Sequence, residues 1–450
     1  MASNSPDIEV LGTFSIDERG NYQNDSSQRR FLVETVNDHL QFDLRDGIDD
    51  YIAQNQRKVR YASLSSVQDW IHDNMQELTE RTILETERGG TRKLNVDFVG
   101  SADVFSLLLR ACECIDRLEI LVRRCNGTYY IESSLRKSQP RRQVAPLAAP
   151  APRPAPPPAP APAPAPQQFF HRPPTMFPSH FNQRPRFGGG RPVATSRAPR
   201  SARESNRTRT SGQSYSRRTS TGSRATTPAR NELSEMKYAR RKFATSITST
   251  DEGGVPNADE PVNANAKYVV VMKRQFGDHS FILSTDVQAE RIDSNQTPPG
   301  NYVCIRARRA HLVGKPFTNF KKYKTLEWWS QAYIAGIPEV LCGMRDDRRH
   351  EITSVKTFEV KQLPEMSDGF WKPRICRKKF KAYLSDIKTL IQDDNPRVVY
   401  RLELPELRLG PGIKDRLQKR KFIFHPPTEE DSVILTDQYR LDVLNIQENN

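Results

Sequence analysis

The sequence contains no apolar run close to the ~18 residues that a membrane-spanning helix needs. Its first residues include Asp7 and Glu9 and lack the apolar core of a secretory signal. Its cysteines also lack the paired C-x2-C spacing that a tetrahedral zinc site usually shows. We therefore expect a soluble intracellular protein with free, buried thiols at Cys112, Cys114, Cys125, Cys304, Cys342 and Cys376.

Lysine and aspartate are missing from one long tract, and their absence locates the positive charge of the protein. Residues 140–231 include 16 arginines, no lysine, no aspartate and one glutamate, so this tract carries a net charge of +15. The whole chain of 450 residues is also +15. The remaining residues are therefore near neutral, which predicts that the folded part does not hold nucleic acid through bulk charge.

The same tract has too few apolar side chains to build a core, which predicts disorder. Alternating alanine and proline at 149–166 favour an extended polyproline spacer, because proline fixes φ and removes a backbone donor. From Arg184 onward the composition is arginine, serine, threonine and glycine. Two interpretations of this part stay open: contact with RNA through phosphate pairing and base stacking, or a solubilising or localising linker.

The segments on either side of the tract each predict only part of a domain. In the first, a helix is expected to begin at Ser65 or Ser66, with an apolar face formed by Val67, Trp70, Ile71 and Met75. Asn126-Gly127 predicts a tight hairpin turn between the apolar runs 118–122 and 128–131. We divide the chain into residues 1–135, a disordered insertion at 136–231, and residues 232–450.

The later segment alternates strand-like runs with helical ones. Strands are predicted at 268–272, 281–287, 302–307 and 339–344, and helices at 321–334 and 378–391. Hairpins combined with strand-helix-strand units indicate mixed β-sheets flanked by helices. The predicted fold class is therefore α/β of the mixed α+β kind, in one composite domain that the long insertion interrupts.

Short motifs follow one another in a fixed order along both segments. They include FDLRDG at 42–47, PGNYV at 299–303, the triplet Cys304-Ile305-Arg306, a helix with Trp328, Trp329 and Gln331, and QDDNP at 392–396. This ordered series resembles the decapping exoribonuclease (DXO) family. The resemblance implies a pocket between β-sheets which, in active members, holds divalent metal and cuts or trims RNA 5′ ends.

The pocket positions implied by the resemblance have lost most of the family's charged residues. An early arginine of the family aligns with Val99, and the glutamate of the family's GYKFE motif aligns with Ala244. The family's two-acid motif aligns with Asp286-Val287-Gln288, and its Glu-x-Lys motif aligns with Cys304-Ile305-Arg306. Of the polar set only Asp286 and Gln331 remain.

One carboxylate, Asp286, beside Arg240 and Arg306 is a poor site for Mg²⁺ or Mn²⁺, which seek several oxygen ligands. We therefore predict no catalytic residue, no metal and no cofactor. Simple structural roles also apply: Cys304 as a small core residue, and Arg306 in a salt bridge to Asp286 rather than on RNA. Gln331 is equally compatible with a buried amide and with a ligand contact.

The retained scaffold, the altered pocket and the added tract together resemble the catalytically degenerate branch of the family found in fly germ cells. That resemblance implies a non-catalytic nuclear protein at piRNA-source chromatin foci of the germline. Its implied partners are a chromodomain heterochromatin protein and the adaptor that links the two, with weak contact to nascent RNA and none to membranes. It would shield nascent transcripts from termination, splicing and 5′-end decay, and so serve piRNA-cluster transcription and transposon silencing.

Two alternatives stay open for the pocket. In the first, Arg240, Arg241 and Arg306 pair directly with a terminal phosphate, and the protein binds RNA 5′ ends without cutting them. In the second, Asp286, Gln331 and Cys304 carry out altered chemistry on RNA ends. A nucleophilic Cys304 would need an adjacent base and a lowered pKa.

Overall fold

A computed structural model describes the two segments on either side of the predicted insertion. The described residues are 8–33, 43–53, 56–78, 82–86, 90–134, 228–257, 259–292, 295–408, 410–425 and 434–446, without the side chains of 56–63 and 228–234. The predicted disordered insertion lies outside them, except that helix α4 (Pro228–Ser246) already begins inside its expected C-terminal end. No helix in the described ranges is long and apolar enough to cross a membrane.

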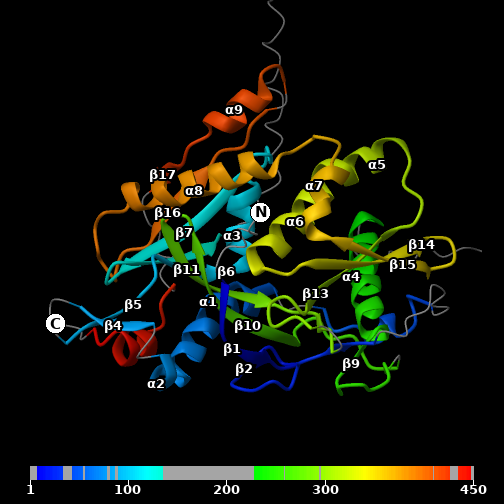
Figure 1. Cartoon of the computed structure of the whole chain (residues 1–450), viewed down its shortest axis with the longest axis horizontal. Coiled ribbons are helices and arrows are strands. Elements are labelled where there is room, and N and C mark those ends of the chain that lie inside the picture. Colours follow the sequence, from blue (N-terminus) through cyan, green and yellow to red (C-terminus); the bar gives the residue numbers. More distant parts are fainter. Residues whose placement is uncertain are drawn as a thin grey trace, which may run out of the picture. The chain divides into compact units, whose positions relative to one another are not determined.

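The first sheet is mixed and has nine strands, in which groups of two or three strands from one segment lie between groups from the other (Figure 1). Strand β6 runs parallel to β8 and β11, and the other neighbouring pairs are antiparallel. Neither segment completes this sheet alone. In sheet order the strands are β17 (Ile423–His425), β16 (Tyr400–Leu404), β7 (Leu118–Cys125), β8 (Thr128–Ser133), β6 (Phe98–Ser101), β11 (His279–Asp286), β10 (Lys267–Phe276), β1 (Ile8–Ile16) and β2 (Tyr22–Gln23).

A second sheet of six strands is also mixed, with β13 parallel to β14 and β12 parallel to β3. The chain crosses from the first sheet to the second between Asp286 and Ala289. In order the strands are β15 (Glu351–Glu359), β14 (Glu339–Asp346), β13 (Tyr302–Arg309), β12 (Ala289–Glu290), β3 (Phe31–Leu32) and β9 (Thr248–Ser249). Strands β4 (Ile83–Glu85) and β5 (Arg92–Leu94) form a separate pair. The mixed α/β prediction is confirmed.

The predicted hairpin is present, and its turn has the backbone that the sequence demands. Asn126 and Gly127 have φ values of 48° and 84°, and the two strands pair up to Cys125 and Thr128. Two successive residues with positive φ form the turn that best follows the right-handed twist of the strands. An Asn-Gly pair reaches that conformation at little cost.

The predicted start of the first helix is wrong. Helix α1 runs from Gln56 to Asp73, so Ser65 and Ser66 lie inside it and not at its start. Three residues of its predicted apolar face, Val67, Trp70 and Ile71, are buried, whereas Met75 lies beyond the end of α1 and is half-buried. The remaining helices and short turns are η1 (Ile48–Asp50), α2 (Met75–Leu78), α3 (Ala102–Arg110), α5 (Gly314–Asn319), the π-helix η2 (Phe320–Lys324), α6 (Thr325–Ala335), η3 (Val360–Gln362), α7 (Leu363–Met366), α8 (Pro373–Leu390), α9 (Ile413–Lys419) and the π-helix η5 (Tyr439–Val443).

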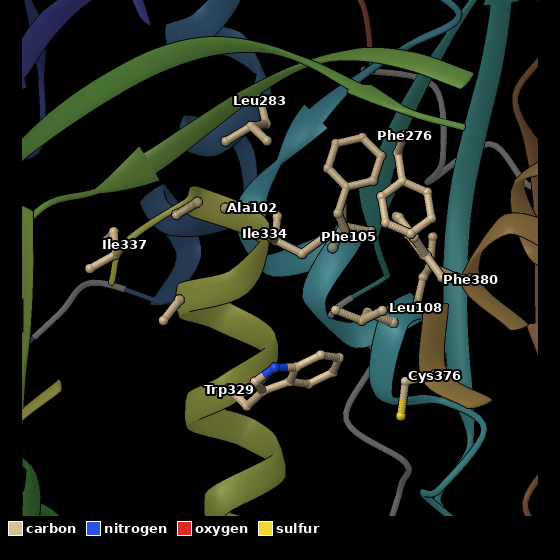
Figure 2. Close-up of a cluster of buried hydrophobic side chains, with 14 of the residues drawn as sticks. Ala102, Phe105, Leu108, Phe276, Leu283, Trp329, Ile334, Ile337, Cys376 and Phe380 are labelled. Atoms are coloured by element: carbon tan, nitrogen blue, oxygen red, sulfur yellow. The ribbon is translucent and has the colours of Figure 1, made fainter. Parts of the chain in front are cut away.

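Alternating side chains give the nine-stranded sheet two buried faces. On β11, Phe281 and Leu283 join a cluster with helices α3, α6 and α8, whereas Ile282 joins a cluster with α1. Figure 2 shows the first cluster, in which Phe105, Phe276 and Phe380 lie together. This cluster also contains Cys304 of the second sheet, so the helices α3, α6 and α8 share one core with both sheets.

Candidate functional site

A cavity of about 350 Å³ is lined by residues of both large sheets and of helices α3, α4 and α6. Seven of the side chains that the sequence singled out line it together. They come from the end of β11 and the crossover after it, from β13, from α6 and from α4: Asp286, Gln288, Cys304, Arg306, Gln331, Arg240 and Arg241. Residues that are up to 91 positions apart in sequence, from 240 to 331, therefore meet in one site.

The buried side chain of Arg306 is held by two amides. Its Nη1 donates to Oε1 of Gln288 (3.1 Å), and its Nη2 donates to Oε1 of Gln331 (3.0 Å). Gln288 is itself fixed, because its Oε1 also accepts from the backbone N–H of Ile305 (3.0 Å). Only 7% of Arg306 is exposed. Its guanidinium is thus positioned by the oxygens of two neutral amides, which do not neutralise its positive charge.

The predicted salt bridge between Arg306 and Asp286 is wrong. Within the described part of the chain Arg306 makes no ion pair, and the residue of the 286–288 motif that it contacts is Gln288. The reason is local, since Asp286 ends β11 and is exposed, whereas Gln288 lies in the crossover and its side chain contacts β13. The Gln331 side chain is half-buried, accepts a hydrogen bond from Arg306 and lines the cavity, and a contact between Gln331 and a ligand stays a prediction.

The charged side chains that line the cavity are mostly cations. Among the described residues they are Arg240, Arg241, Lys267 and Arg306, against Asp103 and Asp286, so cations exceed carboxylates by two. The positive charge of Arg306 lowers the pKa of Arg240, and burial of its guanidinium is a second cause, although the residue as a whole stays exposed. The side chains of Arg240 and Arg241 make no hydrogen bond or ion pair to described residues. An anion bound between them would relieve this crowding of like charges.

Cys304 does not have the environment of an activated nucleophile. Its side chain is almost fully buried, and burial raises the pKa of its thiol even though Arg306 and Arg240 act in the opposite direction. His311, the histidine nearest in sequence, is exposed and does not line the cavity. A neutral thiol without a base beside it is a small core residue, which argues against altered chemistry through Cys304.

We therefore expect Cys304 to resist alkylation. At pH 7.5, iodoacetamide should modify it at least about tenfold more slowly than in urea-unfolded protein, because the attacking species is the thiolate and the side chain is covered. Peptide mass spectrometry at successive times gives the rate at this single position. Labelling of Cys304 as fast in the folded protein as in urea would restore the nucleophile hypothesis.

Two positions that the sequence assigned to the site do not line the cavity. Val99 is fully buried in the cluster that packs on α1, on the opposite face of β6 from Phe98. In that part of the chain, the residues at the site are Ser101, Ala102 and Asp103, where β6 passes into α3. Placing Val99 in the pocket is therefore wrong.

Ala244 is the second such position. It packs against the cluster formed by α4 and the second sheet, and its methyl group does not reach the cavity that Arg240, one turn earlier, lines. Sequence reasoning also missed Lys267. The register of the β10–β11 hairpin sets Val269 opposite Asp286, so counting outward from the turn at Gly277 would have placed Lys267 near Asp286.

The thiols are free as predicted, but the prediction that all of them are buried fails at one position. All six cysteines are free, five of them are buried, and Cys114 is half-buried. Within the described ranges, the one group of side chains spaced to hold a metal ion is Cys112, Glu113 and Cys376, and none of these lines the cavity.

Known proteins place this scaffold in a family. The model of the RAI1 like PD-(D/E)XK nuclease family matches residues 7–148 and 200–423. The decapping and exoribonuclease protein of Mus musculus is 29% identical over 174 residues, which are 37% of this chain and 43% of that protein. The decapping nuclease RAI1 of Cryptococcus neoformans is 26% identical over 175 residues, 37% of this chain and 44% of that protein. These alignments span less than half the length of either relative.

Solved structures agree in fold. Rai1 of Scheffersomyces stipitis, in complex with (3′-NADP)⁺ and calcium ion, has a TM-score of 0.64 at 14% identity, covering 99% of this chain and 97% of that one. Rai1 of Candida albicans, in complex with pU5-Mn²⁺, has a TM-score of 0.65 at 13% identity and covers 99% of both chains. Since the family model matches most of the sequence on both sides of the predicted insertion, this chain belongs to the RAI1-like PD-(D/E)XK nuclease family.

Proposed function

We propose that this protein is a non-catalytic member of its family which binds RNA 5′ ends in the altered pocket instead of cutting them. The observation that carries the proposal is the position of Arg306, whose guanidinium is fixed inside the cavity by Gln288 and Gln331. In the family resemblance this position corresponds to the lysine of a Glu-x-Lys motif. Here the acid of that motif is the buried thiol of Cys304.

The residues of the cavity do not fit a divalent cation. Mg²⁺ and Mn²⁺ are held by several oxygen ligands, and carboxylates usually supply the charge. Of the described lining residues only Asp103 and Asp286 are carboxylates, and four cations accompany them. The cations repel a metal ion and compete for the same carboxylate oxygens. We therefore derive no reaction step through a metal in this protein.

The same residues suit a phosphate. Guanidinium groups donate paired N–H bonds to phosphate oxygens, and charge-assisted hydrogen bonds are stronger than neutral ones. Arg306 is already immobilised, so little side-chain freedom is lost when it binds. Arg240 and Arg241, on α4, line the cavity, and their side chains make no hydrogen bond or ion pair in the described part of the chain. A terminal monophosphate carries the negative charge that would balance the three arginines.

The direct test compares two RNAs that differ only at the 5′ end. We expect an oligonucleotide with a 5′-monophosphate to bind the full chain about tenfold more tightly than the same oligonucleotide with a 5′-hydroxyl, in EDTA, because charged hydrogen bonds contribute ~1.5 kcal/mol or more. Any affinity of the arginine-rich tract acts on both RNAs and cancels in the ratio. Equal affinities, or a preference that appears only with Mn²⁺, would contradict the proposal.

The cellular role we propose rests on the resemblance to the degenerate germ-cell branch. In it, the protein acts in the nucleus at piRNA-source chromatin, recruited by a chromodomain heterochromatin protein and its adaptor. Binding without hydrolysis would shield nascent transcripts from termination, splicing and 5′-end decay. Crosslinking in germ-cell nuclei is the test: we expect this protein on nascent RNA from piRNA clusters, and its absence from both chromatin and nascent RNA would refute the role.

A further inference from the structure

The near-neutral charge of the folded part conceals one strongly basic stretch. Residues 302–326 include seven lysines and arginines and no aspartate or glutamate. The stretch begins on β13 with Arg306 inside the cavity and continues through Arg308 and Arg309. It then forms α5 (Figure 1), passes through the π-helical turn η2 and enters α6, which carries Gln331 back to the cavity. The stretch therefore begins at the pocket and leads into a helix that returns to it, and two of its cations, Arg309 and Lys324, pair with Asp347 and Glu327.

Two large aromatic rings are exposed on this stretch. Phe317 is 40% exposed and Tyr323 is 41% exposed, whereas Phe320 between them is buried under the guanidinium of Arg308. The π-helical turn η2 separates α5 from α6. Such turns are uncommon and occur frequently at functional sites. The fold thus leaves two rings facing solvent, three residues on either side of a buried one.

Each exposed ring has a lysine ammonium close to it. Nζ of Lys321 lies 4.6 Å from the ring centre of Phe317, and Nζ of Lys322 lies 5.0 Å from that of Tyr323. Lys321 also pairs with Asp368 (2.6 Å). Within the described part of the chain, Lys315 and Lys322 make no ion pair, so their charges are available to a partner. Aromatic faces interleaved with cations can stack bases and pair phosphates at the same time.

We propose that Lys315, Phe317, Lys321, Lys322 and Tyr323, here called the α5 surface, bind single-stranded RNA. Bases stack on Phe317 and Tyr323, and the lysines neutralise the backbone phosphates. The surface lies outside the cavity and reads no terminal phosphate. It therefore binds RNA whether or not the pocket holds a 5′ end, and it extends any pocket-bound transcript by a second contact.

The test uses the full chain and a 5′-hydroxyl oligouridylate that contains 4-thiouridine. This probe lacks the terminal phosphate that the pocket is proposed to hold, so failure of one proposal does not hide the other. After irradiation, peptide mass spectrometry should find crosslinks at Phe317 or Tyr323. The double variant Phe317→Ala/Tyr323→Ala should reduce crosslinking to residues 313–324 by about tenfold, as expected for the loss of base stacking.

A second variant measures the phosphate contacts. In Lys315→Ala/Lys322→Ala, the affinity estimated from crosslinking to this surface at several RNA concentrations should depend less on salt. The slope of log affinity against log salt concentration should fall in magnitude by about 1.4, because each lysine that neutralises a phosphate of single-stranded RNA contributes about 0.7. The matched control is Lys361→Ala/Val255→Ala, which removes an exposed lysine and an exposed apolar side chain elsewhere. Equal thermal unfolding of all variants shows that the fold is intact.

Three results would overturn the proposal. Crosslinks confined to residues outside 313–324 would show that RNA does not touch the α5 surface. Unchanged crosslinking in the double aromatic variant would exclude stacking. Capture of an acidic peptide at Phe317 and Tyr323, with no RNA crosslink there, would assign the surface to a protein partner instead.

Discussion

Arg306→Ala is expected to weaken binding of 5′-monophosphate RNA by about tenfold, to the affinity of 5′-hydroxyl RNA, while leaving binding of 5′-hydroxyl RNA unaffected. The estimate follows from the loss of charged hydrogen bonds to phosphate, ~1.5 kcal/mol. Competition binding in EDTA with both RNAs measures the effect. Because Gln288 and Gln331 line a cavity, we expect water to replace the lost donors and the free energy of unfolding to change little.

A conservative variant and a control variant show whether the effect is specific to the paired donors of Arg306. Arg306→Lys keeps a positive charge but not the paired donors, so its affinity should lie between those of wild type and alanine. Arg374→Ala removes an exposed arginine on α8 and should change neither affinity. An Arg306→Ala protein that is folded and still prefers the 5′-phosphate fully would mean that the pocket does not hold the RNA end through this residue.

Phe380→Ala is expected to lower the free energy of unfolding by about 3 to 5 kcal/mol, the range for deleting a large buried ring. Phe380 is fully buried on α8, and its ring centre lies 5.0 Å from that of Phe276 and 6.4 Å from that of Phe105 (Figure 2). Those residues belong to both segments that flank the predicted insertion. The cavity left by alanine therefore weakens the core that joins the segments.

Chemical denaturation followed by tryptophan fluorescence measures this loss. Leu390→Ala is the matched control, because Leu390 ends the same helix and is 42% exposed. Its effect should stay within ~0.5 kcal/mol. If the two variants unfold alike, the junction between α8 and the sheets is not part of the cooperative core.

Local chemistry explains which parts of the fold the sequence predicts correctly. The Asn126-Gly127 hairpin is specified by its own turn residues, and the helix from Thr325 to Ala335 ends at Gly336, whose φ of 70° suits glycine. The helix start at Ser65 failed because a capping residue is effective only where a helix begins, and α1 begins earlier. The π-helical turn before α6 has no local signature that we recognise.

The site depended on non-local geometry, and its errors have that origin. Resemblance to the family brought Gln288, Arg306 and Gln331 to one place, which neither composition nor spacing predicts. It misplaced Val99, because Val99 packs in the core within β6, whereas the residues of this part of the chain that line the cavity, Ser101 to Asp103, follow it where β6 passes into α3. It also paired Arg306 with a carboxylate on charge alone, whereas the backbone crossover presents an amide there.

The most direct measurement is hydrolysis of 5′-monophosphate, 5′-triphosphate and capped RNAs by the purified full chain, with Mg²⁺ or Mn²⁺. Asp286→Ala, prepared in parallel, reports any contaminating nuclease, because Asp286 is one of two described carboxylates that line the cavity. We predict no turnover above that of Asp286→Ala on any of these substrates. Turnover by the wild type that disappears in Asp286→Ala would show a working metal-dependent site and contradict the non-catalytic function.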